Sequence, residues 1–205
     1  MPPAPSHTVF VVDDDGAVRK AVSRLLRSAG ITVTVFASPR EFLAQYDPAT
    51  PGCLVLDIAM PDCNGLQLQT MLDKKGSSLP IIFLTGHGDV SKSVQAMKRG
   101  AFDFLSKPVK DKDLLTAVRA AIERNAVARR EQAQLSAIRD RLDSLTPRER
   151  EVLEHVVSGK LNKQIAGDLG ITEATVKMHR ARVMAKMEVQ SVAELARLTE
   201  RCGIN

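Results

Sequence analysis

Five short apolar runs in the first half of the chain limit most strongly what this sequence can fold into. Each has the length of a buried strand, several are rich in β-branched residues, and the stretches between them show helical spacing. The runs span residues 8–12, 32–36, 53–57, 81–85 and 102–106. Strands that alternate with helices predict an α/β fold with a doubly wound, five-stranded parallel sheet. Ligands of such sheets bind beyond the carboxyl ends of the strands.

Polar residues stand at the carboxyl ends of four of these runs. Asp13 and Asp14 follow the first run, Asp57 ends the third, Thr85 ends the fourth and Lys107 follows the fifth. Three carboxylates in one pocket repel one another unless a cation binds, and all-oxygen ligation favours Mg²⁺ or Mn²⁺. A carboxylate can also attack phosphorus while a metal and an ammonium neutralise the transferred group. Each residue alone is commonly a helix cap or solvated surface, but the set predicts a phosphoryl-accepting site with Asp57 as nucleophile.

Composition sets the expected number of domains and the compartment. A chain of 205 residues exceeds the usual single domain, so two modest domains are expected. The formal charge of +5 is spread over both halves, so nucleic-acid binding has to be argued from a local cluster. The three cysteines lack a C-x-x-C spacing, and the sequence shows neither a signal peptide nor a run of about 18 apolar residues. We expect a soluble, cytoplasmic protein without a membrane partner.

A long helix is predicted between the two halves. Residues 111–145 contain neither Pro nor Gly and are rich in Ala, Arg, Glu, Gln and Leu. Leu135, Ile138, Leu142 and Leu145 recur at spacings of three, four and three residues, as in a short coiled-coil seam. Such a seam either packs on the helix's own domain or joins two copies of the chain, and the sequence leaves both open.

The C-terminal residues predict a small bundle of four helices. The Thr-Pro-Arg-Glu run at 146–149 is a strong helix start, with Thr as N-cap and Pro at the first helical position. Further helices are expected over 162–169 and 172–187 and from Ser191 onward. The tight turn at Gly170 makes the second and third helices a helix-turn-helix candidate, in which the later helix enters the DNA major groove.

The third helix of this bundle has two unlike faces. With about 100° per residue, one face is apolar and predicts the core side: Val176, Val183 and Met187. The other carries Met178 and small side chains, with cations on its rims: Ala174, Ala181, Ala185, Lys177 and Arg182. A cationic helix face is most often simply exposed to solvent. Small residues nevertheless permit close approach to base edges, and Lys177, Arg182 and Lys186 could reach bases or phosphates.

Residues 8–124 resemble the receiver domain of two-component systems. The resemblance rests on these matches in order and spacing: Asp13-Asp14, Asp57 with Met60-Pro61 and Gly65, Thr85-Gly86, and Lys107-Pro108. It implies that the metal is held by the carboxylates of Asp13, Asp14 and Asp57 and the backbone carbonyl of Ala59. It implies further that Lys107 and Thr85 bind the phosphoryl oxygens and that the Lys107–Pro108 bond is cis.

The same resemblance implies a switching pair, Thr85 and Phe104. In the family the hydroxyl moves toward the phosphoryl group while an aromatic ring turns inward, and here Phe replaces Tyr, which removes a phenolic hydrogen bond. The alternative is that Phe104 is a plain core residue of the last strand. The Thr-Gly-His-Gly run at 85–88 resembles the nitrogen-fixation regulator (FixJ) subfamily, and His87 and Asp89 lie near the site in sequence.

Residues 144–202 resemble the LuxR-type output domain. The matches are the runs 145–149, 162–166 and 175–179, followed by Lys186-Met187. The resemblance implies a four-helix DNA-binding domain whose last helix can dimerise. We expect its DNA contacts among eight residues: Lys163, Thr175, Lys177, Met178, Arg180, Ala181, Arg182 and Lys186. Contact at Ala181 can only be apolar, for example with a thymine methyl group.

Together the two resemblances predict a response regulator transcription factor of the FixJ type. Its parts would be a receiver over residues 1–124, a helical linker over 125–143 and a helix-turn-helix domain over 144–205. A sensor histidine kinase would phosphorylate Asp57 and thereby control homodimerisation and binding of promoter DNA, with RNA polymerase as a further partner. Candidates for a receiver pairing face are Val90, Val94, Lys98, Arg99 and Asp103.

Two other functions compete with this prediction. One is a DNA-binding regulator that acts without phosphorylation, against which the complete acidic pocket argues. The other is a Mg²⁺-dependent phosphatase with an Asp nucleophile. Such enzymes need an acid for the leaving group, commonly two residues after the nucleophile, where this chain has Ala59. We therefore expect no enzyme beyond a receiver that promotes its own phosphoryl transfer and slow dephosphorylation.

Overall fold

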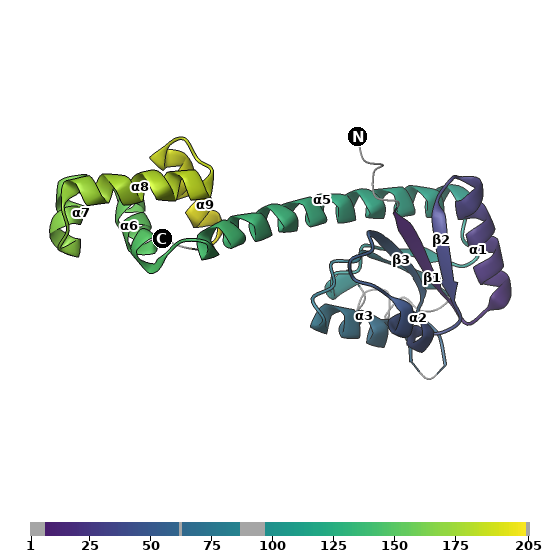
Figure 1. Ribbon diagram of the computed structural model, residues 1–205. Coiled ribbons are helices and arrows are strands. Elements are labelled where there is room, and N and C mark those ends of the chain that lie inside the picture. The colour runs from purple at the N-terminus through teal and green to yellow at the C-terminus, as the bar shows by residue number, and fades with distance from the viewer. Residues whose placement is uncertain (1–6, 62, 87–96, 204–205) are drawn as a thin grey trace. The chain divides into compact units, whose positions relative to one another are not determined.

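The computed structural model describes residues 7–61, 63–86 and 97–203 (Figure 1). The chain divides into two compact units, one ending at Arg129 and the other beginning at Arg130. The candidates His87, Asp89, Val90 and Val94 lie outside the described residues.

A parallel sheet forms the centre of the N-terminal unit, with strand order β2-β1-β3-β4-β5. The strands are β1 (Thr8–Val12), β2 (Thr32–Phe36), β3 (Gly52–Asp57), β4 (Ile81–Thr85) and β5 (Asp103–Ser106). All neighbouring strands pair in parallel, which confirms the predicted doubly wound sheet. β3 begins one residue earlier than the apolar pattern indicates, and β5 begins one residue later.

Gly52 explains why β3 starts early. It pairs with Thr8 of β1, and a β-carbon at Gly52 would lie 1.8 Å from the Thr8 carbonyl oxygen. Its N–H donates to the Asn125 side chain at 3.0 Å, and the same amide group donates to the Ser78 carbonyl. A glycine is not counted in an apolar run, so the sequence pattern does not include it in the strand.

Helices cover both faces of the sheet, and each face has its own core. Among the described residues of the N-terminal unit, the helices are α1 (Gly16–Ser28), α2 (Pro39–Gln45), α3 (Gly65–Lys74) and the first part of α5 (Asp111–Asp143). Alternate residues of β1 point to opposite sides: Val9 and Val11 pack with α1 and α5, whereas Phe10 and Val12 pack with α2 and α3. The period-two alternation of strand side chains therefore supplies both cores.

The long helix α5 confirms the predicted helix between the halves. Its first part buries Leu114 and Val118 against the sheet, and Arg129 donates to the carbonyls of Pro48 and Ala49. Ile138 and Leu142, near its end, are buried in the core of the C-terminal unit. Within one chain, these two residues of the seam therefore pack on their own domain, although the sequence assigned them to a linker.

The C-terminal unit contains α6 (Pro147–Val157), α7 (Asn162–Leu169), α8 (Glu173–Met187) and α9 (Val192–Arg201). Three of these helices begin after N-caps whose side chains accept a backbone N–H: Thr146, Thr172 and Ser191. Gly170 ends α7 in the left-handed conformation and turns the chain into α8. Val176, Val183 and Met187 lie in the core, which confirms the inward face predicted for α8. None of the described helices is long and apolar enough to cross a membrane.

Candidate functional site

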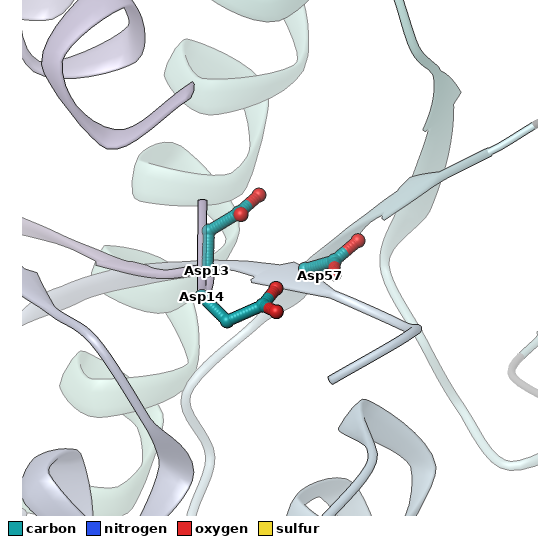
Figure 2. A group of neighbouring side chains, drawn as sticks. All are labelled: Asp13, Asp14 and Asp57. Carbon is teal, nitrogen blue, oxygen red and sulfur yellow. The ribbon is translucent and has the colours of Figure 1, made fainter. Parts of the chain in front are cut away.

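Three carboxylates meet at the carboxyl edge of the sheet (Figure 2). β1 and β3 are neighbours with Val12 opposite Leu56, so Asp13 and Asp57 follow at adjacent positions. One oxygen of each carboxylate of Asp13, Asp14 and Asp57 lies within 4.8 Å of the others. Asp13 and Asp57 are buried, whereas Asp14 is exposed and opens the cluster to solvent.

Among the described residues, Lys107 is the cation that forms ion pairs with these carboxylates. Its Nζ lies 2.7 Å from Asp13 Oδ2 and 3.0 Å from Asp57 Oδ1. Its backbone N–H donates to the carbonyl of Thr85 at 2.7 Å, which holds the end of β5 beside β4. The Lys107–Pro108 peptide is cis, as the sequence predicted.

Burial and charge act in opposite directions on the ionisation of this pair. Burial raises the pKa of Asp57 and the negative charge of Asp13 adds to that rise, whereas Lys107 and the Ala59 N–H lower it, and the net shift is upward. Burial lowers the pKa of Lys107, but its hydrogen bonds to Asp13 and Asp57 outweigh this and the net shift is upward. The site is therefore an anionic cluster whose negative charge is partly balanced by one ammonium.

Two residues beyond the predicted metal and phosphoryl ligands support the cluster, Arg19 and Gly65. Arg19 of α1 donates to the Asp13 carbonyl at 2.6 Å, which fixes the loop after β1. Gly65 begins α3 directly against β3: its N–H donates to the Ile58 carbonyl, and a β-carbon there would lie 2.5 Å from the Asp57 carbonyl oxygen. The receiver motif included Gly65 but did not show that α3 approaches β3 closely there. Nothing in the sequence motif indicated a role for Arg19.

The two members of the predicted switching pair differ in burial. Thr85 is buried at the end of β4, and the preceding Leu84 pairs with Asp57 of β3. The Phe104 side chain on β5 is 44% exposed. Phe104 is therefore not a core residue in this structure, and the alternative reading of it as a plain core Phe is wrong.

The donor set at this edge fits a hard divalent cation. Asp13, Asp14 and Asp57 offer oxygen only, with one carboxylate open to solvent where water can complete the coordination. Ala59 is exposed, and its N–H hydrogen-bonds the Asp57 carboxylate. Burial raises the pKa of the Cys53 thiol to about 12, so Cys53 is an unreactive core residue.

The outward face of α8 carries the residues predicted to read DNA. Lys177, Met178, Ala181 and Arg182 are exposed, and Thr175 is half-buried at its N-terminal end. Its Oγ1 hydrogen-bonds the hydroxyl of the N-cap Thr172 at 2.9 Å. Small and apolar side chains thus form a surface bordered by two free cationic groups, an arrangement suited to a groove of DNA.

The remaining three predicted DNA contacts differ in their surroundings. Lys163 is exposed on α7. Arg180 is half-buried and donates to the Asn162 side chain at 3.0 Å, which ties α8 to α7. Lys186 donates to the buried Glu149 at 2.7 Å. The sequence placed Glu149 in a helix-start motif but gave no sign of its pairing with Lys186.

Two protein families match this chain. Residues 9–119 match the response regulator receiver domain, and residues 143–199 match the luxR family of bacterial regulatory proteins. The chain belongs to the response regulators. As a response regulator with a LuxR-type DNA-binding domain, it is a transcription factor, which confirms the functional class predicted from the motifs.

Relatives match this response regulator across both units. Nodulation protein W of Bradyrhizobium diazoefficiens is 46% identical over 96% of this chain and 87% of its own length. The transcriptional regulatory protein FixJ of Azorhizobium caulinodans is 44% identical over 97% of this chain and 94% of its own. A solved structure of the response regulator StyR has a TM-score of 0.89 and 44% identity, covering 96% of this chain and 99% of that one. The predicted FixJ-type membership is confirmed.

Proposed function

We propose that this response regulator is switched by phosphorylation of Asp57 and that the switch controls its binding to promoter DNA. The observation that carries the proposal is the position of Asp57: its carboxylate lies in the acidic cluster and 3.0 Å from the Lys107 ammonium. A nucleophilic carboxylate next to a fixed cation is the arrangement that phosphoryl transfer requires.

The proposed donor is a phosphohistidine of a sensor histidine kinase. An Asp57 oxygen forms the new bond to phosphorus, the bond between phosphorus and the imidazole nitrogen breaks, and that nitrogen keeps the bonding electron pair and takes a proton from solvent. A Mg²⁺ or Mn²⁺ ion held by Asp13, Asp14, Asp57 and the Ala59 carbonyl would neutralise charge on the transferred group. Lys107 favours the ionised form of Asp57 and would bind a phosphoryl oxygen after transfer.

An apolar groove beside Lys107 supports docking of the kinase. It lies between α1 and the start of α5, is lined by Val18, Leu25, Pro108 and Leu114, and has a volume of about 520 Å³. An apolar groove of this kind suits an amphipathic helix of the kinase. Because Lys107 also lines the groove, a histidine on that helix would lie close to the acceptor Asp57.

Thr85 and Phe104 are the proposed readers of the phosphorylated state. The Thr85 hydroxyl would bind a phosphoryl oxygen, and Phe104, exposed here, would turn toward the space that Thr85 leaves. Phosphorylation would in this way change the surface around β5. Lys98, Arg99 and Asp103 remain proposed members of a pairing face, although Arg99 donates to Thr70 of α3 at 3.3 Å.

The proposed output is a dimer bound to promoter DNA. Lys177, Met178 and Ala181 would face bases, while Lys163, Thr175, Arg180 and Arg182 would contact or border the phosphate backbone. Because RNA polymerase binds the same promoter, we propose it as a further partner of the DNA-bound dimer. Slow loss of the phosphoryl group, promoted by the receiver itself, would end the response, and the lack of an acid at Ala59 fits slow turnover.

A labelling experiment tests the acceptor. Wild type, Asp57→Ala and the control Asp73→Asn, an exposed carboxylate of α3, are incubated with a radiolabelled small-molecule phosphodonor and Mg²⁺. We expect acid-stable but base-labile label on wild type and Asp73→Asn and none on Asp57→Ala. Unlabelled wild type would contradict the proposal, and steady release of phosphate from many esters would favour the phosphatase.

A further inference from the structure

Lys186 in the last turn of α8 points into its own domain. Its Nζ donates to Glu149 Oε2 at 2.7 Å and to the Ser144 carbonyl at 3.0 Å. The Glu149 side chain is 3% exposed and that of Lys186 is 36% exposed. Two of the three ammonium protons are therefore used by the residues that lead into and begin α6.

Glu149 also holds the start of α6. Its Oε2 accepts the N–H of Thr146 at 2.9 Å, and its own N–H donates to Thr146 Oγ1 at 3.3 Å, forming a capping box. The hydrogen bond from Lys186 is the largest cause that lowers the pKa of Glu149, to about 2. One buried carboxylate thus joins the N-terminus of α6 to the C-terminus of α8.

The end of α8 has a second attachment. Arg141, near the end of α5, donates to the Met187 carbonyl at 3.4 Å and pairs with the carboxylate of Glu188. Glu188 is the C-cap of α8 and has the left-handed φ of 55° that is uncommon for a residue other than glycine. Lys186 and Arg141 therefore hold the same end of α8 from two sides.

Other cations of the domain are placed differently. Lys163, Lys177 and Arg182 are exposed, and their side chains form no ion pair with another described residue. They can meet phosphates without breaking an internal contact. If Lys186 turned to a phosphate, the buried Glu149 carboxylate would lose its ammonium partner, which disfavours that movement.

We propose that Lys186 is a positioning residue, which sets the angle of the DNA-reading helix α8 through Glu149 and makes no contact with DNA itself. The proposal rests on the DNA-binding function proposed above. It changes the role of a residue that the sequence placed among the DNA contacts. A phosphate contact strengthens binding to DNA of any sequence. The orientation of α8, by contrast, affects only specific binding, in which side chains contact base edges.

The experiment measures how DNA binding depends on salt. The full chain, treated with a small-molecule phosphodonor and Mg²⁺, is used to select a 30-base-pair duplex from a random pool, and an unrelated duplex of equal length serves as the non-specific probe. Affinities for both are measured over a range of KCl concentrations. Failure of wild type to select any duplex would contradict the proposed DNA-binding function, separately from the role of Lys186.

Three substitutions separate positioning from contact. Lys186→Met should weaken binding to the selected duplex about tenfold, with little change on the unrelated duplex and an unchanged slope of log K against log salt. Lys186→Arg, which can still pair with Glu149, should restore most of the specific affinity. The matched control Lys177→Met removes an exposed cation of α8 and should reduce the slope by about 0.9, the value for one phosphate contact, or relax base preference.

The variant Glu149→Gln distinguishes the two possible roles of Lys186, positioning of α8 and contact with a DNA phosphate. If Lys186 positions α8, this variant weakens specific binding to the same extent as Lys186→Met, and the double variant is no weaker than either single one. If Lys186 contacts a phosphate, freeing it from Glu149 leaves affinity unchanged or raises it. A slope reduced by about 0.9 in Lys186→Met, or unchanged or increased affinity in Glu149→Gln, overturns the proposal. Should Lys186→Met not fold, the Glu149→Gln comparison alone decides.

Discussion

The ammonium of Lys107 lies 3.0 Å from Asp57 Oδ1, and this contact balances charge at the candidate acceptor. Lys107→Met would leave buried carboxylates without a cation, so we expect the free energy of unfolding to fall by about 1–3 kcal/mol. Phosphoryl uptake should fall as well, because the transferred group loses its cation. Urea unfolding and the rate of labelling measure the two effects.

Mg²⁺ provides the control for this variant. Since the ion would supply the missing positive charge, its addition should stabilise Lys107→Met more than wild type. The same Mg²⁺ effect on both proteins would contradict the assigned charge balance.

Gly65 is expected to tolerate no side chain. A β-carbon at this position would lie 2.5 Å from the Asp57 carbonyl oxygen and 3.0 Å from a Phe83 ring carbon. Gly65→Ala must therefore push α3 away from β3, which costs about 1–3 kcal/mol and slows labelling of Asp57. Gly16→Ala is the matched control, because its β-carbon would meet only ordinary contact with the Arg19 side chain. Equal stability and labelling for the two variants would show that the close approach is unimportant.

The Glu149–Lys186 pair predicts how stability depends on pH. The pKa of Glu149 is lowered in the folded protein from 4.5 to about 2, so its contribution is present above pH 4.5 and is lost as the pH falls toward 2. At pH 7 we expect Glu149→Gln to be less stable than wild type by on the order of 2–3 kcal/mol. Thermal unfolding followed by circular dichroism should show this difference shrinking between pH 4.5 and pH 2. If the difference in stability between wild type and Glu149→Gln did not change with pH, ionisation of Glu149 would not be its cause.

Phe104 should matter more for signalling than for stability. With its side chain 44% exposed, Phe104→Ala should cost less than about 1 kcal/mol, whereas Phe83→Ala, fully buried in the same sheet, should cost about 3–5 kcal/mol. If Phe104 reads the phosphorylated state, its removal should weaken the effect of a phosphodonor on DNA binding while labelling of Asp57 continues. If the phosphodonor changed DNA binding of Phe104→Ala as much as that of wild type, Phe104 would have no role in the switch.

Local patterns in the sequence were enough to predict most of the fold. The strand ends placed Asp13, Asp57 and Lys107 at one edge because parallel strands share a direction, and helix caps such as Thr146 located the helices of the C-terminal unit. Contacts that depend on distant pairing were missed. Gly52, for example, belongs to β3 because it pairs with Thr8 and donates to Asn125, and neither partner is close to it in the sequence.

The same limit applies to the candidate sites. Lys177 and Lys186 are both lysines on one helix, and the sequence treated both as DNA contacts. Only the folded chain shows that Lys186 meets Glu149, 37 residues earlier, while Lys177 is exposed. Arg19 was missed for a similar reason, since its partner is a backbone carbonyl rather than a side chain with a recognisable motif.

In the proposed switch, phosphorylation of Asp57 controls DNA binding through α8. The most direct test measures the affinity of the full chain for a duplex that it selects, before and after treatment with a phosphodonor and Mg²⁺, in wild type and in Asp57→Ala. We predict an increase of about tenfold or more for wild type and no change for Asp57→Ala. An equal increase in both proteins, or none in labelled wild type, would contradict the account.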